Sequence, residues 1–421
     1  MRSSCSSVLS ETEHVKTGIF RSLRNFNYRV WAAGALVSNI GTWMQRTAQD
    51  WLVLTQLTHH NASAVGIVMS LQFGPQLVLL PWTGFAADYF NQRKLLMFTQ
   101  ATMGILALAL GLLTVTGVVQ LWHVYVFALL FGCTTAFDAP VRQTFVSELV
   151  TDDELANAVA LNSTSFNGAR MVGPAVAGLV IATVGTGWAF LLNGVSFFAV
   201  LVSLSYLRES ELRLKARAQR AKGSLIAGFH YVWKRPDLKA ILIMLFLIGT
   251  FGLNFPIFIS TMAVDVFHAD ARGYGVLSSM MALGTVSGSL MNAHRQQPRF
   301  TLLLVGAACF GIGCTLAAFA PSYWLFGAAL VITGVAALTF MNSTNSLMQL
   351  TTEPAMRGRV MALRLGIAMG GTPLGAPIVG WIADHIGARW AMGVGAASGV
   401  AAALVAAHAI RRNLHHAPSS S

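Results

Sequence analysis

From Trp31 to Ile410 the chain is a near-continuous succession of apolar stretches separated by short polar and basic loops. There are about twelve stretches, and each approaches the roughly 20 residues that a helix needs to cross a bilayer. This pattern predicts an all-α membrane protein with twelve transmembrane helices. The predicted spans are 30–57, 64–87, 95–117, 121–147, 156–184, 188–207, 238–262, 273–293, 301–320, 322–348, 357–384 and 388–410.

A segment in the second half of the chain repeats one in the first half. The first copy contains Ala160, Leu161, Gly168, Gly173, Gly178, Gly185 and Trp188. The same residue types recur 202 positions later at Ala362, Leu363, Gly370, Gly375, Gly380, Gly387 and Trp390. This offset predicts a duplicated helical unit, as in many secondary transporters, with a substrate site between the repeats. The predicted units are a tail (1–27), a six-helix bundle (28–207), a connector (208–237), a second six-helix bundle (238–410) and a tail (411–421).

The composition excludes a soluble domain. Of the 421 residues, 55% are hydrophobic and only 10% are charged, against roughly 25% charged residues in an average soluble domain. The net charge is +12, but the basic residues lie in short loops and form no stripe with interleaved aromatic residues, so we expect no nucleic-acid partner. Residues 1–27 lack an apolar core followed by a small-residue cleavage site, so no removed signal peptide is expected.

Motifs of catalysis and metal binding are missing from the sequence. The four cysteines have neither disulfide-framework nor zinc spacing, and no intramembrane cluster of His and carboxylate residues has metal-ligand spacing. There is no Gly-rich phosphate loop that ends in Lys and Ser or Thr. We therefore expect no catalytic residue, metal or cofactor. Any transport is expected to draw energy from an ion gradient, the substrate gradient or a separate subunit.

Basic residues are concentrated on one face of the predicted bundle, whereas the loops of the other face carry only Arg272 and Arg389. Basic loops stay in the cytoplasm, and an even number of spans places both chain ends on one side. Both termini are therefore predicted to be cytoplasmic, in the inner (cytoplasmic) membrane of the cell. The basic residues of that face are Lys16, Arg21, Arg24, Arg29, Arg93, Lys94, Arg142, Arg295, Arg299, Arg357, Arg359, Arg411 and Arg412.

The connector over 208–237 has a basic part followed by an apolar part. Its apolar residues recur at helical spacing, which favours an amphipathic helix on the cytoplasmic leaflet, attracted by anionic lipid. A solvated linker is the alternative. The residues concerned are Arg213, Lys215, Arg217, Arg220, Lys222, Leu225, Ile226, Phe229, Val232 and Trp233.

The first span contains ionisable residues where the bilayer makes them costly. Arg46 and Asp50 are four residues apart and therefore share a helical face, with Asn39 on the same stripe. Gln45 and Gln49 extend this polar face. Each charge costs about 2.5 to 3.5 kcal/mol at the bilayer centre, so we expect the face to line a cavity with a role in transport. A static ion pair that holds the span to its bundle is the alternative.

Other spans carry polar residues whose role is more open. Asp138 and Arg142 repeat the four-residue spacing on the fourth span, where a scaffold role and a transport role are equally expected. The polar residues of spans five, ten and eleven bond either a substrate or neighbouring helices. These candidate cavity residues are Asn162, Asn167, Arg170, Asn342, Asn345 and Arg364.

The loop over 84–94 (GFAADYFNQRK) resembles the signature loop of the major facilitator superfamily. The matching residues are Gly84, Asp88, Arg93 and Lys94. The departures from the family pattern are Tyr89, Asn91 and Gln92, which leave fewer positive partners. The resemblance implies a cytoplasmic gate formed by this loop together with Asp138 and Arg142.

Four further stretches resemble one branch of this superfamily, the transmembrane secretion effector-like efflux proteins that include the bacterial enterobactin exporter. They are GTWMQRTAQDWLVL (41–54), AFDAPVRQTFVSELV (136–150), NAVALNSTSFNGARMVGPAVAG (157–178) and MRGRVMALRLGIAMGGTPLGAPIVG (356–380). Within the third stretch, Gly173, Pro174 and Gly178 resemble a motif of antiporters that export their cargo. Small residues that simply let helices pack closely are the alternative explanation.

Together these features predict a secondary transporter that exports a small amphiphilic molecule, such as a drug, a siderophore or a secreted metabolite. We expect alternating access, with proton uptake at Asp50 releasing Arg46 and changing the stability of the two facing states. The expected partners are the cargo, protons and the lipid bilayer, with the chain acting as a monomer. The alternatives are uptake by the same fold or a non-transporting membrane sensor or scaffold, and a membrane enzyme is disfavoured.

Overall fold

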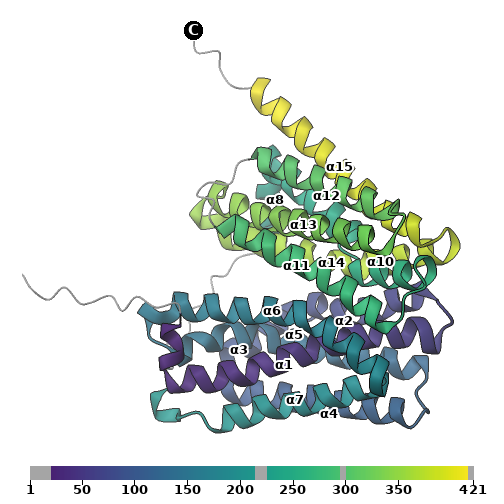
Figure 1. Ribbon diagram of the computed structural model, residues 1–421. Coiled ribbons are helices and arrows are strands. Elements are labelled where there is room, and N and C mark those ends of the chain that lie inside the picture. Colours follow the sequence, from purple (N-terminus) through teal and green to yellow (C-terminus); the bar gives the residue numbers. More distant parts are fainter. Residues whose placement is uncertain (1–19, 214–224, 294–299, 416–421) are drawn as a thin grey trace, which may run out of the picture.

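The computed structural model describes residues 20–213, 225–293 and 300–415, which form two helical bundles lying side by side (Figure 1). No β-strand occurs among the described residues. The first half consists of η1 (Arg21–Arg24), α1 (Phe26–Trp51), η2 (Leu52–Leu57), α2 (Ala62–Val78), α3 (Leu80–Tyr89), α4 (Gln92–Val115), α5 (Leu121–Leu149), α6 (Asp152–Val184), α7 (Thr186–Ser205) and η3 (Glu209–Glu211). The second half consists of α8 (Leu225–Lys234), α9 (Pro236–Leu247), η4 (Ile248–Gly252), α10 (Phe255–Thr261), η5 (Met262–Val266), α11 (Ala271–Ala293), α12 (Phe300–Ala318), α13 (Tyr323–Thr351), α14 (Pro354–His385) and α15 (Ala388–His415).

The helical segments correspond to the predicted membrane spans. Nine segments of the described chain are long and apolar enough to cross a membrane. The other three predicted spans correspond to α1, α2 with α3, and α11. Helix α1 falls short in hydropathy because it carries Arg46 and Asp50 within a face of amides, whereas α2 alone has only 17 residues. The fold therefore places its least apolar span where part of that span can face away from lipid.

Two predicted spans are interrupted in the structure. The span over 64–87 divides into α2 and α3 at Leu79, and Pro81 stands in the first turn of α3, where a missing N–H is tolerated. The span over 238–262 divides at Leu253 and Asn254, between the π-helical turn η4 and α10. Pro256 in the first turn of α10 has no amide with which to continue the helical ladder. The backbone of this span is therefore irregular near the middle of its length.

Two helix crossings join the halves. Helix α2 packs against α14, and α6 packs against α11, whereas the remaining large helix contacts lie within one half (Figure 1). A Cβ atom added at Gly178 would lie 2.6 Å from the Ala271 carbonyl oxygen, and one at Gly380 would lie 2.5 Å from that of Ala62. Only glycine fits at such separations. Because Gly178 and Gly380 are 202 positions apart, the sequence repeat puts the same residue at equivalent points of the two crossings.

Each crossing also contains an equivalent hydrogen bond. At the α6–α11 crossing, the Ser279 hydroxyl donates to the Met171 carbonyl oxygen over 2.8 Å. At the α2–α14 crossing, the Ser70 hydroxyl donates to the Pro373 carbonyl oxygen over 2.7 Å. Met171 and Pro373 are again related by the 202-residue offset. The two crossings are therefore close copies of one interface.

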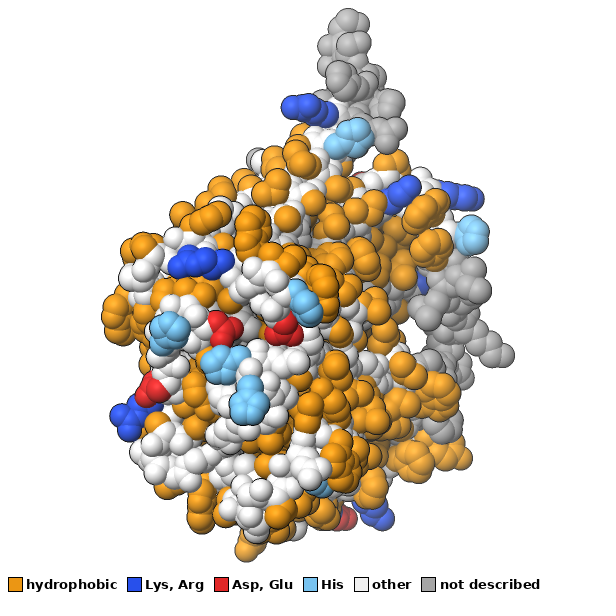
Figure 2. Space-filling view, turned by 90° about the vertical axis from the view of Figure 1, so that its right-hand side faces the viewer, with side chains coloured by type: hydrophobic (Ala, Val, Ile, Leu, Met, Phe, Trp, Pro, Cys, Tyr) orange, Lys and Arg blue, Asp and Glu red, His pale blue; other side chains and the backbone are white. Residues whose placement is uncertain are grey.

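Further contacts join the halves at the distal face, the face of the loops over 58–61, 267–270 and 386–387. The Asp384 carboxylate accepts hydrogen bonds from the backbone N–H groups of Ala62 (2.6 Å) and Ser63 (2.9 Å), at the start of α2, where the helix dipole favours a negative charge. Nearby, His60 Nδ1 lies 2.9 Å from Asp265 Oδ1. Histidine and acidic side chains gather near the middle of this face (Figure 2). These contacts hold the two halves together at the distal face.

The opposite face, which carries η1 and the end of α15, is here called the terminal face. Helix α8 lies against α14 there, where Gly228 approaches Arg359 closely. Phe229 and Trp233 are exposed on α8, and their rings stack with centroids 5.1 Å apart. The connector residues Lys215, Arg217, Arg220 and Lys222 and the loop residues Arg295 and Arg299 lie outside the described residues. The predicted interfacial helix is thus represented by α8 alone.

Candidate functional site

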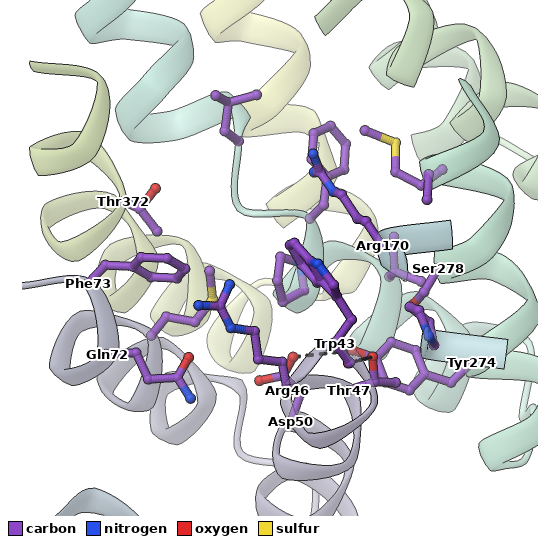
Figure 3. Close-up of a pocket in the computed structure, with 18 residues that line it drawn as sticks. Trp43, Arg46, Thr47, Asp50, Gln72, Phe73, Arg170, Tyr274, Ser278 and Thr372 are labelled. Carbon is purple, nitrogen blue, oxygen red and sulfur yellow. Dashed lines mark hydrogen bonds between the residues drawn. The ribbon is translucent and has the colours of Figure 1, made fainter. Parts of the chain in front are cut away.

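A cavity of about 190 Å³ lies between the two halves (Figure 3). The first half lines it from α1, α2 and α6, and the second half lines it from the segment 253–259, α11 and α14. The interruption before α10 brings Leu253, Phe255 and Pro256 to the cavity wall. The polar lining residues are Arg46, Thr47, Asp50, Gln72, Arg170, Tyr274, Ser278 and Thr372.

The predicted polar face of α1 divides between the cavity and the bundle interior. Arg46 and Asp50 line the cavity, whereas the other three residues do not. Gln45 accepts a hydrogen bond of 2.6 Å from the Asn193 amide of α7. Gln49 is buried, and its amide nitrogen has no partner among the described residues. Asn39 lies in a network of the first half described below, so only the Arg46 and Asp50 positions of this face reach the cavity.

Asp50 connects the two halves across the cavity. Its carboxylate accepts a hydrogen bond of 3.4 Å from the Tyr274 hydroxyl of α11, and both side chains are buried (Figure 3). The Tyr274 ring stacks on Trp51, with centroids 5.9 Å apart, which fixes the direction of the hydroxyl. Arg46 and Asp50 form no ion pair within 4.0 Å in the described part of the chain. The static ion pair considered as an alternative is therefore not present in this state.

Two arginines of the cavity lie against one tryptophan ring. The guanidinium carbons of Arg46 and Arg170 are 5.1 and 5.3 Å from the Trp43 ring centroid, within the range of cation–π attraction. Arg46 also lies 5.3 Å from the Phe73 centroid. A Cβ added at Gly173 of α6 would lie 2.5 Å from the Trp43 Cβ, so this glycine lets α6 approach α1 at the tryptophan. Gly173 thereby lets the Trp43 ring lie close both to Arg46 of its own helix and to Arg170 of α6.

The other motif residues of α6 lie at the same level. Pro174 lines the cavity, and a Cβ added at Gly275 of α11 would lie 2.4 Å from the Pro174 carbonyl oxygen. Gly178 lies at the same α6–α11 crossing, one turn further along the helix. Of this set, Pro174 lines the cavity, whereas Gly173 and Gly178 allow the close approach of α6 to α1 and to α11. Close packing accounts for the two glycines, and a role of the motif in the direction of transport remains a prediction.

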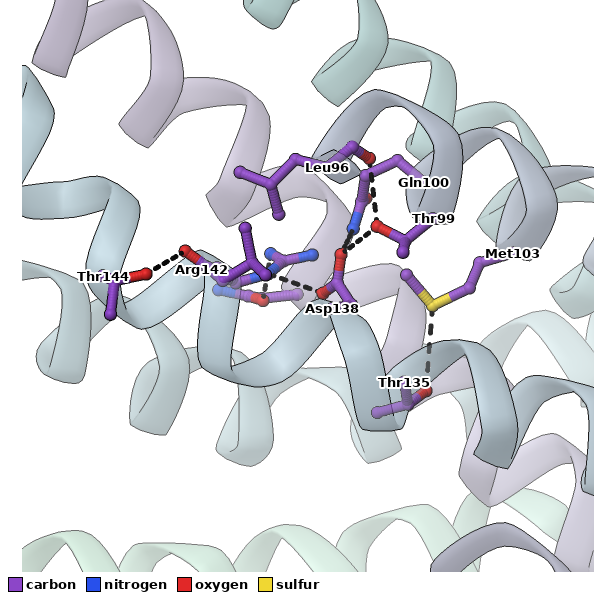
Figure 4. A network of polar contacts seen from close by, with 10 residues as sticks. Leu96, Thr99, Gln100, Met103, Thr135, Asp138, Arg142 and Thr144 are labelled. Atoms are coloured by element: carbon purple, nitrogen blue, oxygen red, sulfur yellow. Dashed lines mark hydrogen bonds and ion pairs between the residues drawn. The ribbon is translucent and has the colours of Figure 1, made fainter. Parts of the chain in front are cut away.

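Asp138 lies in a hydrogen-bond network inside the first half (Figure 4). Its carboxylate accepts bonds of 2.7 Å from both Thr99 and Gln100 of α4, and one of 3.0 Å from Arg142. Arg142 also donates to Asn39 of α1 over 3.4 Å. The network thus connects α1, α4 and α5, and every partner named here belongs to the first half.

The remaining predicted gate residues lie at the terminal face. Arg93 pairs with the Glu209 carboxylate and donates to the Leu204 carbonyl oxygen over 2.7 Å, which ties the start of α4 to the end of α7. The Lys94 backbone N–H donates to the side chain of Asn91, which caps the start of α4. Gly84 and Asp88 belong to α3, but their side-chain placement lies outside the described part. The partners named for Arg93 belong to the first half, so the gate between the halves remains a prediction.

The other predicted polar residues do not line the cavity, apart from Arg170. Arg364 of α14 donates to the Met341 carbonyl oxygen over 2.8 Å and to Thr344 over 3.2 Å, inside the second half. The Asn167 amide donates to the Ser163 carbonyl oxygen of its own helix. Asn162, Asn342 and Asn345 are half-buried. Within the described residues, no group of three or more His, Cys, Asp or Glu side chains could hold a metal ion.

The sequence interpretation missed several residues of the site. Trp43 carried a usable signal, because it lies three residues before Arg46 and therefore on the same helical face. Asp384 carried one as well, as an acidic residue at the end of an otherwise apolar span. Tyr274, Phe73 and the wall around Pro256 carried none, because their positions depend on how distant helices pack.

Residues 17–420 match the family model described as transmembrane secretion effector. A staphyloferrin A transporter of Staphylococcus aureus is 26% identical over 253 residues, which are 60% of this chain and 63% of that protein. The multidrug efflux pump Tap of Mycolicibacterium fortuitum is 26% identical and covers 84% of this chain and 88% of its own length. The enterobactin exporter EntS of Shigella flexneri is 25% identical and covers 78% of each chain.

Solved structures of the same fold support the architecture. A bacterial homologue of the human lysosomal transporter Spinster, in an inward-facing and occupied conformation, superposes with a TM-score of 0.72. The match covers 95% of this chain and 100% of that chain at 15% identity. Twelve membrane helices in two six-helix bundles, the major facilitator fold, are thereby confirmed.

Proposed function

Because this chain belongs to the transmembrane secretion effector family of major facilitator transporters, we propose that its central cavity carries a small molecule out of the cell by proton-coupled alternating access. The chain is a multi-pass membrane transporter and not an enzyme. Its relatives include a multidrug efflux pump and an enterobactin exporter, which favours efflux over uptake. The cargo classes that we propose are drugs, siderophores and secreted metabolites.

The observation that carries the proposal is the ionisable cavity between the two halves. Arg46, Asp50 and Arg170 face a space whose other wall comes from the second half. A sensor or scaffold has no need for such a space. We place both termini in the cytoplasm, because basic residues gather at the terminal face. With this orientation, the contacts at the distal face lie on the outer side of the membrane, and we propose that the described state opens toward the cytoplasm.

Asp50 is our candidate for the proton site. In the described state its carboxylate accepts the hydrogen bond from Tyr274, which joins α1 to α11 of the other half. Protonation removes the negative charge that strengthens this bond and that attracts Arg46. The relative stability of the two facing states then changes with the protonation of one side chain. Asp138 is the reserve candidate, although three hydrogen bonds within the first half already hold its carboxylate.

The Asp50→Asn variant tests this proposal. We expect it to insert and fold, because asparagine keeps the shape of the side chain, but to lose efflux driven by a pH gradient. The measurement is cargo movement in vesicles with an imposed pH gradient, and the comparison is with Asp138→Asn. Full gradient-driven transport by Asp50→Asn would remove Asp50 from the mechanism. Loss in Asp138→Asn alone would assign the coupling to the reserve candidate.

Our proposed cytoplasmic gate combines the signature loop with two residues of α5. Its residues are Gly84, Asp88, Arg93, Lys94, Asp138 and Arg142. In the described state Arg93 is paired with Glu209 and Arg142 with Asp138. Both ion pairs lie within the first half and do not join it to the second half. We expect the contacts between the halves to form only when the terminal face closes. Unchanged rates of alternating access in Asp88→Ala, read by cysteine labelling on both sides, would exclude this gate.

One chain supplies the whole cavity, so we propose that the monomer is the transporting unit. The bilayer is the remaining partner, and the exposed Phe229 and Trp233 of α8 suit the cytoplasmic lipid interface. Lys239 lies 4.1 Å from the Trp233 ring centroid and adds a positive charge at this level. Helix α8, which ends at Lys234, together with Lys239 of α9 therefore has the apolar and basic parts that an interfacial helix needs.

A further inference from the structure

The cavity has an excess of positive charge. Its ionisable lining residues are Arg46, Asp50 and Arg170, so two guanidiniums face one carboxylate. All three come from the first half, and the second half contributes hydroxyl and apolar groups to the wall. When all three groups are ionised, an occupant that carries one negative charge makes the cavity neutral.

The two guanidiniums are unusual in having no polar partner. Among the described residues, neither Arg46 nor Arg170 makes a hydrogen bond or an ion pair within 4.0 Å. Two other arginines of the spans have polar partners: Arg142 binds Asp138, and Arg364 binds the Met341 carbonyl oxygen. A guanidinium has five N–H donors, and leaving them unpaired away from bulk water is costly. The cavity therefore offers donors that a bound anion can satisfy.

The aromatic residues around the two arginines indicate which chemical group is joined to the anionic group of the cargo. Both guanidiniums lie just over 5 Å from the centre of the Trp43 ring, and Phe73 lies beside Arg46. Stacking against a ring fixes the plane of a guanidinium, which suits two parallel hydrogen bonds to a planar carboxylate. Phe255 and Pro256 of the opposite wall provide apolar surface facing the arginines. The site thus combines an anion-binding side with an apolar side.

We propose that the cargo is an organic anion, in which a carboxylate or a similar planar anionic group is joined to an aromatic or other flat apolar body. The anionic group binds Arg170 and Arg46, and the flat body packs between Trp43 and the Phe255 wall. This inference rests on the proposed transport function and specifies its cargo class. Amphiphilic cations, which many efflux systems carry, are disfavoured by the same two charges.

An anionic cargo also affects the driving force. An inside-negative membrane potential favours the outward movement of a negative charge by a factor of about 50 per 100 mV. Proton entry through Asp50 moves charge in the direction that the same potential favours. Export of an anion therefore depends on the membrane potential in addition to any pH gradient.

The test uses three probes that share one ring system: naphthalene-1-acetate, its neutral amide, and 1-naphthylmethylammonium. Equilibrium binding to the purified full-length protein in detergent is measured for each probe. We expect the carboxylate to bind about tenfold or more tightly than the other two. Equal binding of the three probes, or no saturable binding of the carboxylate, would overturn the proposal. This comparison needs no substitution and is therefore independent of variant folding.

Variants then assign the preference to the arginines. Arg170→Gln is expected to reduce the preference for the carboxylate to less than about twofold, and Arg170→Lys to retain part of it. Lys239→Gln is the matched control, because it also removes a cation from a tryptophan ring but lies outside the cavity. A full preference in Arg170→Gln would contradict the assignment.

Transport separates this inference from the proposed function. In vesicles with an imposed potential, outward movement of the carboxylate supports both. Preferential binding without movement leaves the anion site in place and contradicts the transport function for this cargo class. Movement of the ammonium probe without binding of the carboxylate contradicts the anion site and leaves the transport function in place.

Discussion

The two halves of the molecule are alike where they cross and unlike where they face the cavity. Gly178 and Gly380, related by the sequence repeat, allow the same close approach at the two crossings. At the cavity the repeat partner of Arg170 is Thr372, and both line the space. The comparison teaches that the duplicated unit preserves the surfaces on which the halves move, whereas the ionisable chemistry belongs to the first half.

A second difference lies at the distal face. Asp384 accepts three hydrogen bonds from the first turn of α2, namely from the backbone N–H groups of Ala62 and Ser63 and from the Ser63 hydroxyl. Its repeat partner in the first half is Ala182. At the α2–α14 crossing, a carboxylate of one helix therefore accepts hydrogen bonds from the other helix. The α6–α11 crossing has no carboxylate at the equivalent position. The two crossings share their packing but differ in how firmly they are closed.

The largest effect on transport is expected from a substitution that disturbs the packing of one crossing and leaves the other unchanged. Valine at Gly178 or at Gly380 places atoms within 3 Å of a carbonyl oxygen of the partner helix, and overpacking of this kind costs about 1 to 3 kcal/mol. We expect each variant to lose most of its transport while still inserting in the membrane. Vesicle transport and thermal unfolding are the measurements. Gly168→Ala is the control on α6, because a Cβ there meets nothing within 4 Å.

If the two crossings are mechanically equivalent, Gly178→Val and Gly380→Val should impair transport to a similar degree. Near-normal transport in one of them would show that only the other crossing has to close. That result would mean that the two crossings are alike in their packing but not in their role in transport.

The next effect tests whether the position of the positive charge matters. Arg170→Thr makes the first half resemble the second at this point, and we expect about tenfold weaker binding of naphthalene-1-acetate, since hydrogen bonds to charged groups contribute about 1.5 to 3 kcal/mol. The double variant Arg170→Thr with Thr372→Arg keeps the net charge but moves it to α14. We expect it to leave binding weak, because the moved guanidinium no longer stacks on Trp43. Restored binding would show that net charge alone decides affinity.

A smaller effect is expected at the distal face. Asp384→Asn makes the two crossings more alike by removing the negative charge at the start of α2, where such a charge contributes about 0.3 to 1 kcal/mol. We expect the distal face to open more often by a factor of about two to five. Accessibility of a cysteine placed at Ala62, whose side chain is buried and is not a partner of Asp384, to an impermeant maleimide measures this opening. Unchanged accessibility would mean that the glycine contacts alone keep the face closed.

Much of the fold could be predicted from the sequence, because lipid imposes a length and an apolar composition on each span. The same logic identified Arg46 and Asp50, since a charge inside an apolar span needs a cavity or a partner. It failed for Gln45 and Asn39, which lie on the same stripe of α1 but bind Asn193 and Arg142 inside the bundle. A helical stripe tells which residues avoid lipid. It does not tell whether they meet water or another helix.

The interruptions of two spans were not predicted, although Pro81 and Pro256 lie at the points concerned. Proline is tolerated in the first turn of a new helix as well as inside a kinked one, so its presence alone does not decide between the two. The partners across the cavity, above all Tyr274 opposite Asp50, depend on the packing of helices more than 200 residues apart. Local pattern carries no information on such pairs.

The proposed transport requires this cavity to open alternately to the two sides of the membrane. The direct measurement is maleimide labelling of Ser278→Cys, a cavity position, in a background with Cys5, Cys133, Cys309 and Cys314 replaced by alanine. We predict labelling from the terminal, cytoplasmic side at rest, and a shift toward labelling from the distal side when the outside is acidified. Asp50→Asn is predicted to abolish this shift. Labelling from one side only under all conditions, or equal labelling from both sides at all times, would contradict the account.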